Sequence, residues 1–246
     1  MLAIIGGTGL TQLSSLEVLR REVARTPYGE PSGALTFGRL CEREVVFLAR
    51  HGYGHTIPPH RVNYRANLWA LQDAGAKSIV SVASVGGIRP DCAPGALVVP
   101  DQILDYTWGR VGTFFDDIET PVRHIDFTHP YDETIRRAIL AAAQAAGEPI
   151  IDGGVYATTQ GPRLETAAEI DRFERDGADM VGMTGMPEAA LARELDVPYA
   201  AIAVVANYAA GRRASAAGIR FERVEEVLQD AMTRVRKVLV QLCGQA

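Results

Sequence analysis

The chain has 246 residues, 47% of them apolar and 22% charged, which is typical of a globular protein and excludes an intrinsically disordered one. Its formal net charge of −5 provides no basic surface for nucleic acid or for an anionic membrane. The cysteines at positions 41, 92 and 243 are too widely spaced for a metal motif or a disulfide framework, and no apolar run is long enough to span a membrane.

Strand-like and helix-like patterns alternate along the chain. In chain order we predict strands over 2–7 and 44–50, a helix over 63–75, strands over 77–87 and 95–100, a helix over 131–147, a strand over 153–162, a helix over 165–177, a strand over 178–185, a helix over 186–196, a strand over 198–207 and a long amphipathic helix over 221–244. The strands are apolar on both faces, so a sheet covered on both sides is expected. This alternation predicts one α/β domain over 1–246, with a mixed, mostly parallel central sheet flanked by helices.

Two further segments have distinct compositions. The apolar N-terminus lacks a basic region and a cleavage site, so we interpret it as the first strand and expect a cytoplasmic protein with reduced thiols. The segment 211–220 places two arginines among small residues and is predicted to be a mobile loop.

The first candidate site lies at the end of the first strand. Ligands of α/β sheets bind beyond the carboxyl ends of the strands. Here the sequence Gly-Gly-Thr-Gly at 6–9 lets backbone N–H groups approach an anion, and Thr8 adds a hydroxyl donor. The segment is neither a dinucleotide fingerprint nor a Walker loop. Taken alone, a tight turn is the plainer explanation of these residues.

Polar residues also follow other predicted strands. Arg50 and His51 adjoin a glycine, and a guanidinium suits phosphate because it is a planar donor; a surface Arg-His pair is the alternative. Glu165 stands near the start of a predicted helix, where it can equally complement the helix dipole. Met183 and Thr184 end another strand, although a methionine is more often core filler. The five histidines have no metal-binding spacing, so no metal is expected.

Together these segments resemble the trimeric purine nucleoside phosphorylases, most closely the methylthioadenosine phosphorylase branch. The matching segments are IIGGTGL, ARHGYGHTIPPHRVNYRANLWAL, QGPRLETAAE, DMVGMTGMPEAALARELDVPYA and ANYAAG, in family order over nearly the whole chain. The resemblance implies cleavage of a purine nucleoside by phosphate into the free base and a sugar 1-phosphate. It also implies a homotrimer that uses no metal and no organic cofactor, and the net charge adds the expectation that neither nucleic acid nor a membrane is bound.

The resemblance assigns roles to individual residues. The residues implied around phosphate are Thr8, Arg50, His51, Thr184 and, on a looser match, Ser84. Those implied for the nucleoside are Met183 at the ribose, Glu165 and Asn207 at the base with Tyr208 and Ala209 beside them, and Phe221 together with His124 of a neighbouring subunit at the 5′ substituent.

The base-facing residues depart from the adenine branch, which carries Asp at the position of Asn207. A carboxylate only accepts hydrogen bonds, whereas a carboxamide can accept from N7–H and donate to O6 of a 6-oxopurine. Glu165 stands where that branch shows Ser and can accept from N1–H, and Ala209 replaces a second Asp. We therefore predict a 6-oxopurine base, with Asn207 and Glu165 as the catalytic residues. A mispaired buried polar group costs roughly 1–3 kcal/mol.

The 5′ side narrows the prediction further. Oxopurine enzymes of this family use a histidine where this chain has Phe221, and an aromatic ring suits an apolar methylthio group. The predicted substrate is S-methyl-5′-thioinosine, and the resemblance extends to methylthioinosine phosphorylases. Packing of Phe221 against the core is the alternative interpretation. A general 6-oxopurine nucleoside phosphorylase and a methylthioadenosine phosphorylase that tolerates Asn207 stay open. A purine binder without activity and a hydrolase are disfavoured, because the phosphate and base sets are both complete.

Overall fold

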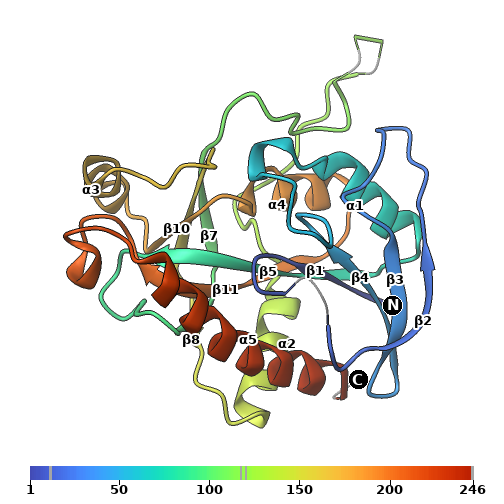
Figure 1. Ribbon diagram of the computed structural model, residues 1–246. Helices are drawn as coiled ribbons and strands as arrows, with labels where there is room; N and C mark the ends of the chain where they lie inside the picture. Colours follow the sequence, from blue (N-terminus) through green and yellow to red (C-terminus); the bar gives the residue numbers. More distant parts are fainter. Residues whose placement is uncertain (11–12, 117, 120, 245–246) are drawn as a thin grey trace.

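A branched β-sheet with helices on both faces forms the centre of the computed structural model, which describes residues 1–10, 13–116, 118–119 and 121–244 (Figure 1). The strands of the described residues are β1 (Leu2–Gly6), β2 (Glu17–Glu22), β3 (Leu35–Leu40), β4 (Arg43–Ala49), β5 (Ser78–Gly87), β6 (Leu97–Val99), β7 (Gln102–Tyr106), β8 (Ile151–Asp152), β9 (Val155–Thr159), β10 (Met180–Gly182) and β11 (Tyr199–Tyr208). The helices are α1 (Tyr64–Asp73), α2 (Glu133–Ala145), α3 (Ala167–Arg175), α4 (Gly185–Glu194) and α5 (Phe221–Gly244), with short 3-10 turns η1 (Pro59–Arg61) and η2 (Arg213–Ser215).

The sheet branches at β5, its long central strand. The main path runs β2-β3-β4-β1-β5-β10-β9-β7, and β11 adds to β5 and continues to β6 and β8. The first half of β5 pairs with β1, its last two residues pair with β10, and β11 runs parallel to it along its whole length. Six of the ten strand pairings between described residues are parallel, which confirms the predicted mixed, mostly parallel sheet. Near the end of β5 the sheet divides, with β10 on one side and β11 on the other.

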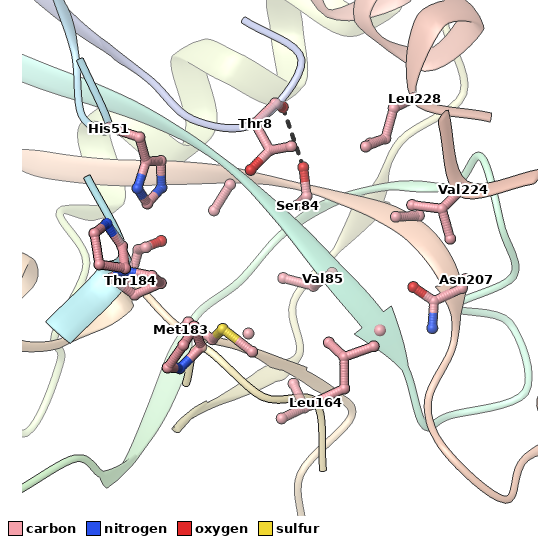
Figure 2. A pocket seen from close by; sticks show the side chains of 18 of the residues that line it. Thr8, His51, Ser84, Val85, Leu164, Met183, Thr184, Asn207, Val224 and Leu228 are labelled. Carbon is pink, nitrogen blue, oxygen red and sulfur yellow. Dashed lines mark hydrogen bonds between the residues drawn. The ribbon is translucent and has the colours of Figure 1, made fainter. Parts of the chain in front are cut away.

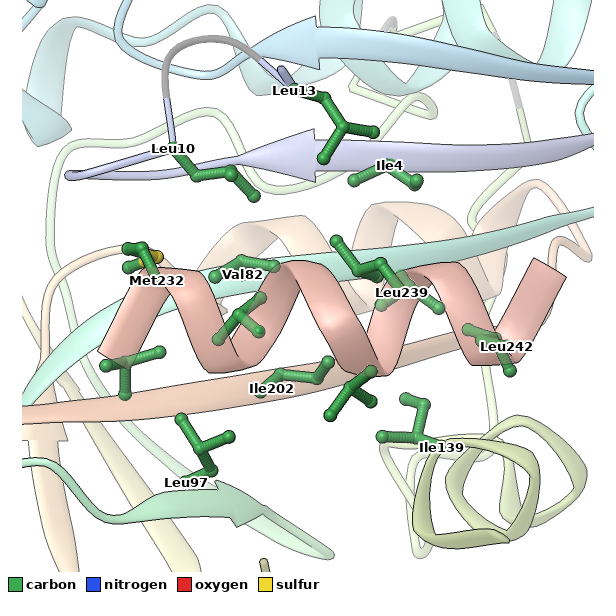
Figure 3. Packing of buried hydrophobic residues seen from close by; sticks show 14 of the residues in the cluster. Ile4, Leu10, Leu13, Val82, Leu97, Ile139, Ile202, Met232, Leu239 and Leu242 are labelled. Atoms are coloured by element: carbon green, nitrogen blue, oxygen red, sulfur yellow. The ribbon is translucent and has the colours of Figure 1, made fainter. Parts of the chain in front are cut away.

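Both faces of the central strands are buried, as their apolar composition predicts. Neighbouring residues of β1 point to opposite faces, so Ile4 belongs to one core cluster and Ile5 to the other. Helix α5 lies along the first face, where Leu239 lies opposite Ile4 and Met232 lies opposite Leu10 (Figure 3). Helices α1 and α4 cover the second face. Continuous apolar burial of this kind fixes the strand ends rigidly in space.

The predicted helices and strands all form, with adjusted ends. Glycines 75, 147 and 177 adopt positive φ directly after α1, α2 and α3, which is the left-handed conformation that ends helices. The sequence did not reveal β2, β3, β7 and β8. The segment 211–220 contains η2, and Arg212 pairs there with Asp171 and Glu174 of α3. No described helix combines the length and apolar character needed to cross a membrane.

Candidate active site

One cavity of about 490 Å³ lies at the branch of the sheet. The ends of β1, β4, β5, β10 and β11 line it, together with the loop before α3 and the first turns of α5 (Figure 2). The site residues predicted from sequence that line it within one chain are Thr8, Arg50, His51, Ser84, Glu165, Met183, Thr184, Asn207, Ala209 and Phe221. The fold therefore brings together in one cavity ten of the residues that the strand ends and the family resemblance singled out.

The turn after β1 approaches β4 and β5 closely because it is built from glycine. A Cβ on Gly7 would lie 2.5 Å from the carbonyl oxygen of Val82 and 2.8 Å from Nη1 of Arg50. Any side chain there would displace the backbone or the guanidinium, so this glycine is needed for packing. The hydroxyl of Ser84 donates to the carbonyl of Thr8 at 3.2 Å, which ties the turn to β5 (Figure 2).

Arg50 is fully buried, and most of its donors are already used. Its Nε and Nη2 donate to the two carboxylate oxygens of Glu188 at 2.6 and 2.8 Å, and both side chains are 1% exposed. Nη2 also donates to Ser81, and Nη1 donates to the carbonyl of Val82. The planar fork that the sequence argument offered to phosphate thus faces Glu188, and a single N–H of Nη1 stays available beside Gly7.

Glu188 balances this buried charge. It accepts hydrogen bonds from Arg50, from Ser81 at 2.8 Å and from the hydroxyl of Tyr199 at 2.8 Å. Burial alone would raise the pKa of Glu188, but the charge and hydrogen bonds of Arg50 lower it. Burial would likewise lower the pKa of Arg50, and Glu188 raises it above its ordinary value. Both groups are therefore ionised, and their charges cancel beside the cavity.

His51 is neutral with a defined tautomer. Its Nδ1 lies 2.8 Å from the carbonyl oxygen of Ile57, and because a carbonyl only accepts, Nδ1 carries the proton. Burial, aided by the neighbouring charge of Arg50, lowers the pKa of His51 to about 4. The unprotonated Nε2 is the ring nitrogen left to face the cavity (Figure 2).

Thr184 brings a helix start to the same end of the cavity. It occupies the N-cap position of α4, but its side chain makes no capping hydrogen bond. Its backbone N–H donates to the hydroxyl of Tyr156 at 3.4 Å. The backbone is non-helical at Met186, so the regular part of α4 begins after it, and Thr184 contributes its hydroxyl to the cavity wall below His51 (Figure 2).

The opposite end of the cavity presents a carboxamide and a carboxylate. The register of β11 against β5 shifts between Val205 and Asn207, and this bulge sets the direction in which Asn207 leaves the strand. One N–H of Asn207 donates to the carbonyl of Tyr208 at 2.6 Å, so Oδ1 and a second N–H are left for a ligand. Ala209 is 2% exposed and adds only a methyl group to the wall.

Glu165 is not part of a helix. Helix α3 begins at Ala167 after the N-cap Thr166, and Glu169 closes its capping box, so the helix dipole does not account for Glu165. Thr159 donates to Oε1 of Glu165 at 2.7 Å. Burial raises the pKa of Glu165, while this hydrogen bond opposes the shift. A half-buried carboxylate in the cavity is a hydrogen-bond acceptor placed for a ligand.

Of the four remaining predicted residues, two line the cavity and two do not. Met183 lines the cavity, and a Cβ on Gly161 would lie 2.4 Å from its sulfur, so the glycine makes room for it. Phe221 is 67% exposed at the cavity rim, which rules out the interpretation that it packs α5 against the core of its own chain. Tyr208 does not line the cavity, because it points away from Asn207 along the strand. His124 is exposed on the segment between β7 and α2, away from the cavity of its own chain.

Sequence reasoning missed Arg110, which joins the two ends of the cavity. Its Nη1 donates to the carbonyls of Met183 and Met186 at 2.8 and 2.6 Å. Its Nη2 donates to the carbonyls of Thr159 and Gln160 at 3.2 and 2.8 Å. The guanidinium therefore fixes the end of β10, which carries Thr184, to the end of β9, which leads to Glu165. A lone arginine in a loop gives no sequence signal for this role.

The cavity offers no metal site. Among the described residues, no group of three or more His, Cys, Asp or Glu side chains is arranged to hold an ion. The ionisable groups in the cavity wall are Arg50, His51, His55 and Glu165.

Comparison with known proteins gives a consistent picture. A family model described as the phosphorylase superfamily matches residues 1–243. A relative in Pseudomonas syringae pv. tomato, named "Probable S-methyl-5′-thioinosine phosphorylase", is 55% identical over 98% of this chain and 97% of its own. The 6-oxopurine nucleoside phosphorylase of Pyrococcus furiosus is 45% identical over 97% of this chain and 90% of its own. Methylthioadenosine phosphorylase from Schistosoma mansoni, solved with adenine, superimposes with a TM-score of 0.94 at 32% identity, covering 99% and 91% of the two chains.

Proposed function

This chain belongs to the phosphorylase superfamily, and we propose that it cleaves S-methyl-5′-thioinosine with phosphate, giving hypoxanthine and 5-methylthioribose 1-phosphate. The observation that carries the proposal is that Asn207 and Glu165 line one cavity with the residues expected around phosphate. The relative from Pseudomonas syringae carries a name for the same activity, which supports the choice of substrate.

The base end fits a 6-oxopurine. In this proposal Oδ1 of Asn207 accepts from N7–H of the purine, and its second N–H donates to O6. Glu165 accepts from N1–H, which neutral adenine lacks. Adenine would set its amino group against the donor of Asn207, and such a mismatch disfavours it by about ten- to a hundredfold. The neutral wall at Ala209 provides no further acceptor for an amino group.

Phosphorolysis needs two things from the protein: stabilisation of the departing base and a phosphate held against C1′ of the sugar. As the C1′–N9 bond breaks and a C1′–O bond to phosphate forms, the departing purine takes up a proton at N7 from solvent, and solvent takes the proton that hydrogen phosphate gives up. Oδ1 of Asn207 holds the new N7–H, its N–H stabilises the charge that develops on O6, and Glu165 accepts from N1–H and orients the base. Phosphate at the Thr8, His51 and Thr184 end attacks the sugar as it gains oxocarbenium character. No protein nucleophile is required, and none of the described wall residues is a lysine or a cysteine. Neither a metal nor an organic cofactor takes part in this scheme.

The sugar end is apolar. Phe221, Val224 and Leu228 of α5 line the cavity there, and they suit a methylthio group better than a hydroxyl. A hydroxyl placed among them would lose its hydrogen bonds to water. A general 6-oxopurine nucleoside phosphorylase is the second candidate, favoured by the likeness to the Pyrococcus furiosus relative.

We further propose a cytoplasmic homotrimer. The segment between β7 and α2 extends away from the sheet (Figure 1), and its exposed apolar side chains include Trp108, Ile118 and Val122. The same segment carries His124, which a neighbouring subunit would receive at its 5′ pocket. The described cysteines are all free, which agrees with a reducing compartment. Light scattering that shows a fully active monomer would contradict the trimer.

A substrate panel tests the function. Methylthioinosine, methylthioadenosine, inosine, guanosine and adenosine are each supplied with and without phosphate, and release of the base is measured. The expected result is phosphate-dependent cleavage with the highest kcat/KM for methylthioinosine. Equal rates without phosphate would remove the assignment as a phosphorylase. A kcat/KM for inosine that equals the one for methylthioinosine would select the second candidate.

A further inference from the structure

The anion end of the cavity contains two hydrogen-bond acceptors in a place where donors alone would be expected. A fully deprotonated oxyanion can only accept hydrogen bonds, so a site built for it needs donors on every side. Thr8, Thr184 and the free N–H of Arg50 meet this need. His51 and Ser84 do not.

The acceptor at His51 follows from its tautomer. Its single ring proton is on Nδ1, where the carbonyl of Ile57 holds it at 2.8 Å. The Nε2 lone pair therefore faces the cavity and can only accept. The groups that face the ring are Arg50, whose pair with Glu188 is neutral as a whole, and the ring of His55, whose centroid lies 4.9 Å away. Glu188 favours a second proton on the ring, but burial and the charge of Arg50 outweigh it, so the pKa of His51 is lowered.

The acceptor at Ser84 is independent of His51 and belongs to another strand. Its hydroxyl proton is directed to the carbonyl of Thr8, which cannot donate in return (Figure 2). The oxygen of Ser84 then presents its lone pairs to the cavity. Two strands, β4 and β5, thus each place one acceptor at the same end of the cavity.

We propose that this end of the cavity selects a protonated oxyanion, hydrogen phosphate, and that His51 and Ser84 make the selection. Near neutral pH inorganic phosphate keeps a proton on oxygen, whereas sulfate, of the same shape and charge, has none. The single P–OH of hydrogen phosphate can donate to one of the two acceptors at a time, whereas sulfate would leave both facing a lone pair, and such a mismatch gives large discrimination between close analogues. The inference rests on the proposed function, because it assumes that phosphate binds at this end.

The test compares three tetrahedral anions at pH 7.5. Binding of phosphate, arsenate and sulfate to the intact enzyme is measured by calorimetry, and sulfate is used as a competitor of phosphate in the cleavage assay. Arsenate keeps a proton and should bind as phosphate does. We expect sulfate to bind at least about tenfold more weakly than phosphate. Equal binding of sulfate and phosphate would overturn the proposal.

Single substitutions test whether His51 and Ser84 determine the preference for phosphate over sulfate. His51→Gln gives the side chain an amide that can turn a donor toward the anion, so the preference for phosphate over sulfate should fall about tenfold. Ser84→Ala removes the other acceptor and should lower the preference by a smaller factor. The matched control is His60→Gln, which changes an exposed histidine outside the cavity wall and should leave the ratio as it is. A ratio that falls equally in the His60 variant would also contradict the proposal.

The two proposals fail in different ways. If no nucleoside is cleaved in the presence of phosphate, the proposed function falls, whatever the anions do in the calorimeter. If cleavage depends on phosphate but sulfate competes equally well, the proposed function stands and the selection by protonation falls.

Discussion

The two ends of the cavity are held in place to very different degrees. At the anion end, Arg50 is buried and makes four hydrogen bonds to Glu188, Ser81 and Val82, all within the core. At the base end, Glu165 and Asn207 are half-buried and make one side-chain hydrogen bond each. A rigid anion end suits the step that every phosphorylase of this family shares, and a lightly held base end can change its preference through a few substitutions. The buried network should therefore govern stability, and the base end should govern substrate choice.

The largest effect is expected from Glu188→Gln, which leaves the charge of Arg50 buried without a counter-ion. Breaking a buried ion pair from one side destabilises a protein by about 3–5 kcal/mol. The free energy of unfolding is measured by urea titration. The matched control is Asp196→Asn, which breaks an exposed pair with Arg123 and should change the free energy of unfolding by less than about 1 kcal/mol. Similar losses in both variants would show that the anion end is no more rigid than the surface.

Arg110→Ala should separate the two ends from each other. The guanidinium holds carbonyls from both sides, and a displacement of reacting groups by about 1 Å can lower a rate by about a hundredfold. We expect kcat/KM to fall by about that factor, with KM rising for the nucleoside and for phosphate. Arg65→Ala is the control, because Arg65 pairs with Asp116 near the same loop and not with the cavity. A loss confined to one substrate would mean that Arg110 serves only one end.

Asn207→Asp should change substrate choice and spare the anion end. The carboxylate replaces a donor by an acceptor, so the ratio of kcat/KM for methylthioadenosine to that for methylthioinosine should rise about ten- to a hundredfold. KM for phosphate should stay constant. Tyr208→Phe serves as the control, since Tyr208 lies next in the strand but outside the cavity wall. An unchanged ratio in the Asp variant would mean that another group reads position 6 of the purine.

The difference between the two ends also explains what the sequence could predict. Strands β1, β5 and β11 are apolar on both faces and end in small or polar residues, so the strands and the candidate residues at their ends were visible in the pattern. Strand β2 was not, because all six of its residues are exposed and most are charged. Short strands such as β8, with two residues, carry no pattern at all.

The residues that hold the site in place were harder to predict from the sequence. Glu188 is one of three charged residues in α4, and nothing in the sequence of that helix marks it as the one that meets Arg50 across 138 positions. Its role exists only once α4 packs beside β4. Arg110 is similar, because it binds backbone carbonyls, and any sequence can provide those. The residues that line the cavity could be predicted because they stand at the ends of strands. The residues that hold them in place, such as Glu188 and Arg110, are recognised only from the tertiary structure.

The smallest expected effect is the pH dependence of stability that comes from His51. Its pKa is about 4 in the folded chain and about 6.5 in the unfolded one, because burial and the charge of Arg50 disfavour the imidazolium. The unfolded state therefore binds more protons between these values, and the free energy of unfolding falls as the pH falls below about 6.5. Glu188 and His55 also face the ring, but the difference between wild type and a His51 variant isolates its own share.

Between pH 7 and pH 5.5, the fall in the free energy of unfolding that is due to His51 is about 1 kcal/mol. His51→Gln should flatten the pH dependence of the free energy of unfolding by this amount, measured by urea titration at both pH values. His60→Gln is the control, because His60 is exposed and lies outside the cavity wall. A slope unchanged in the His51 variant would place the folded pKa near its ordinary value. The imidazole would then be free to take up a second proton beside a bound anion, and the anion end would lose the acceptor on which its selectivity depends.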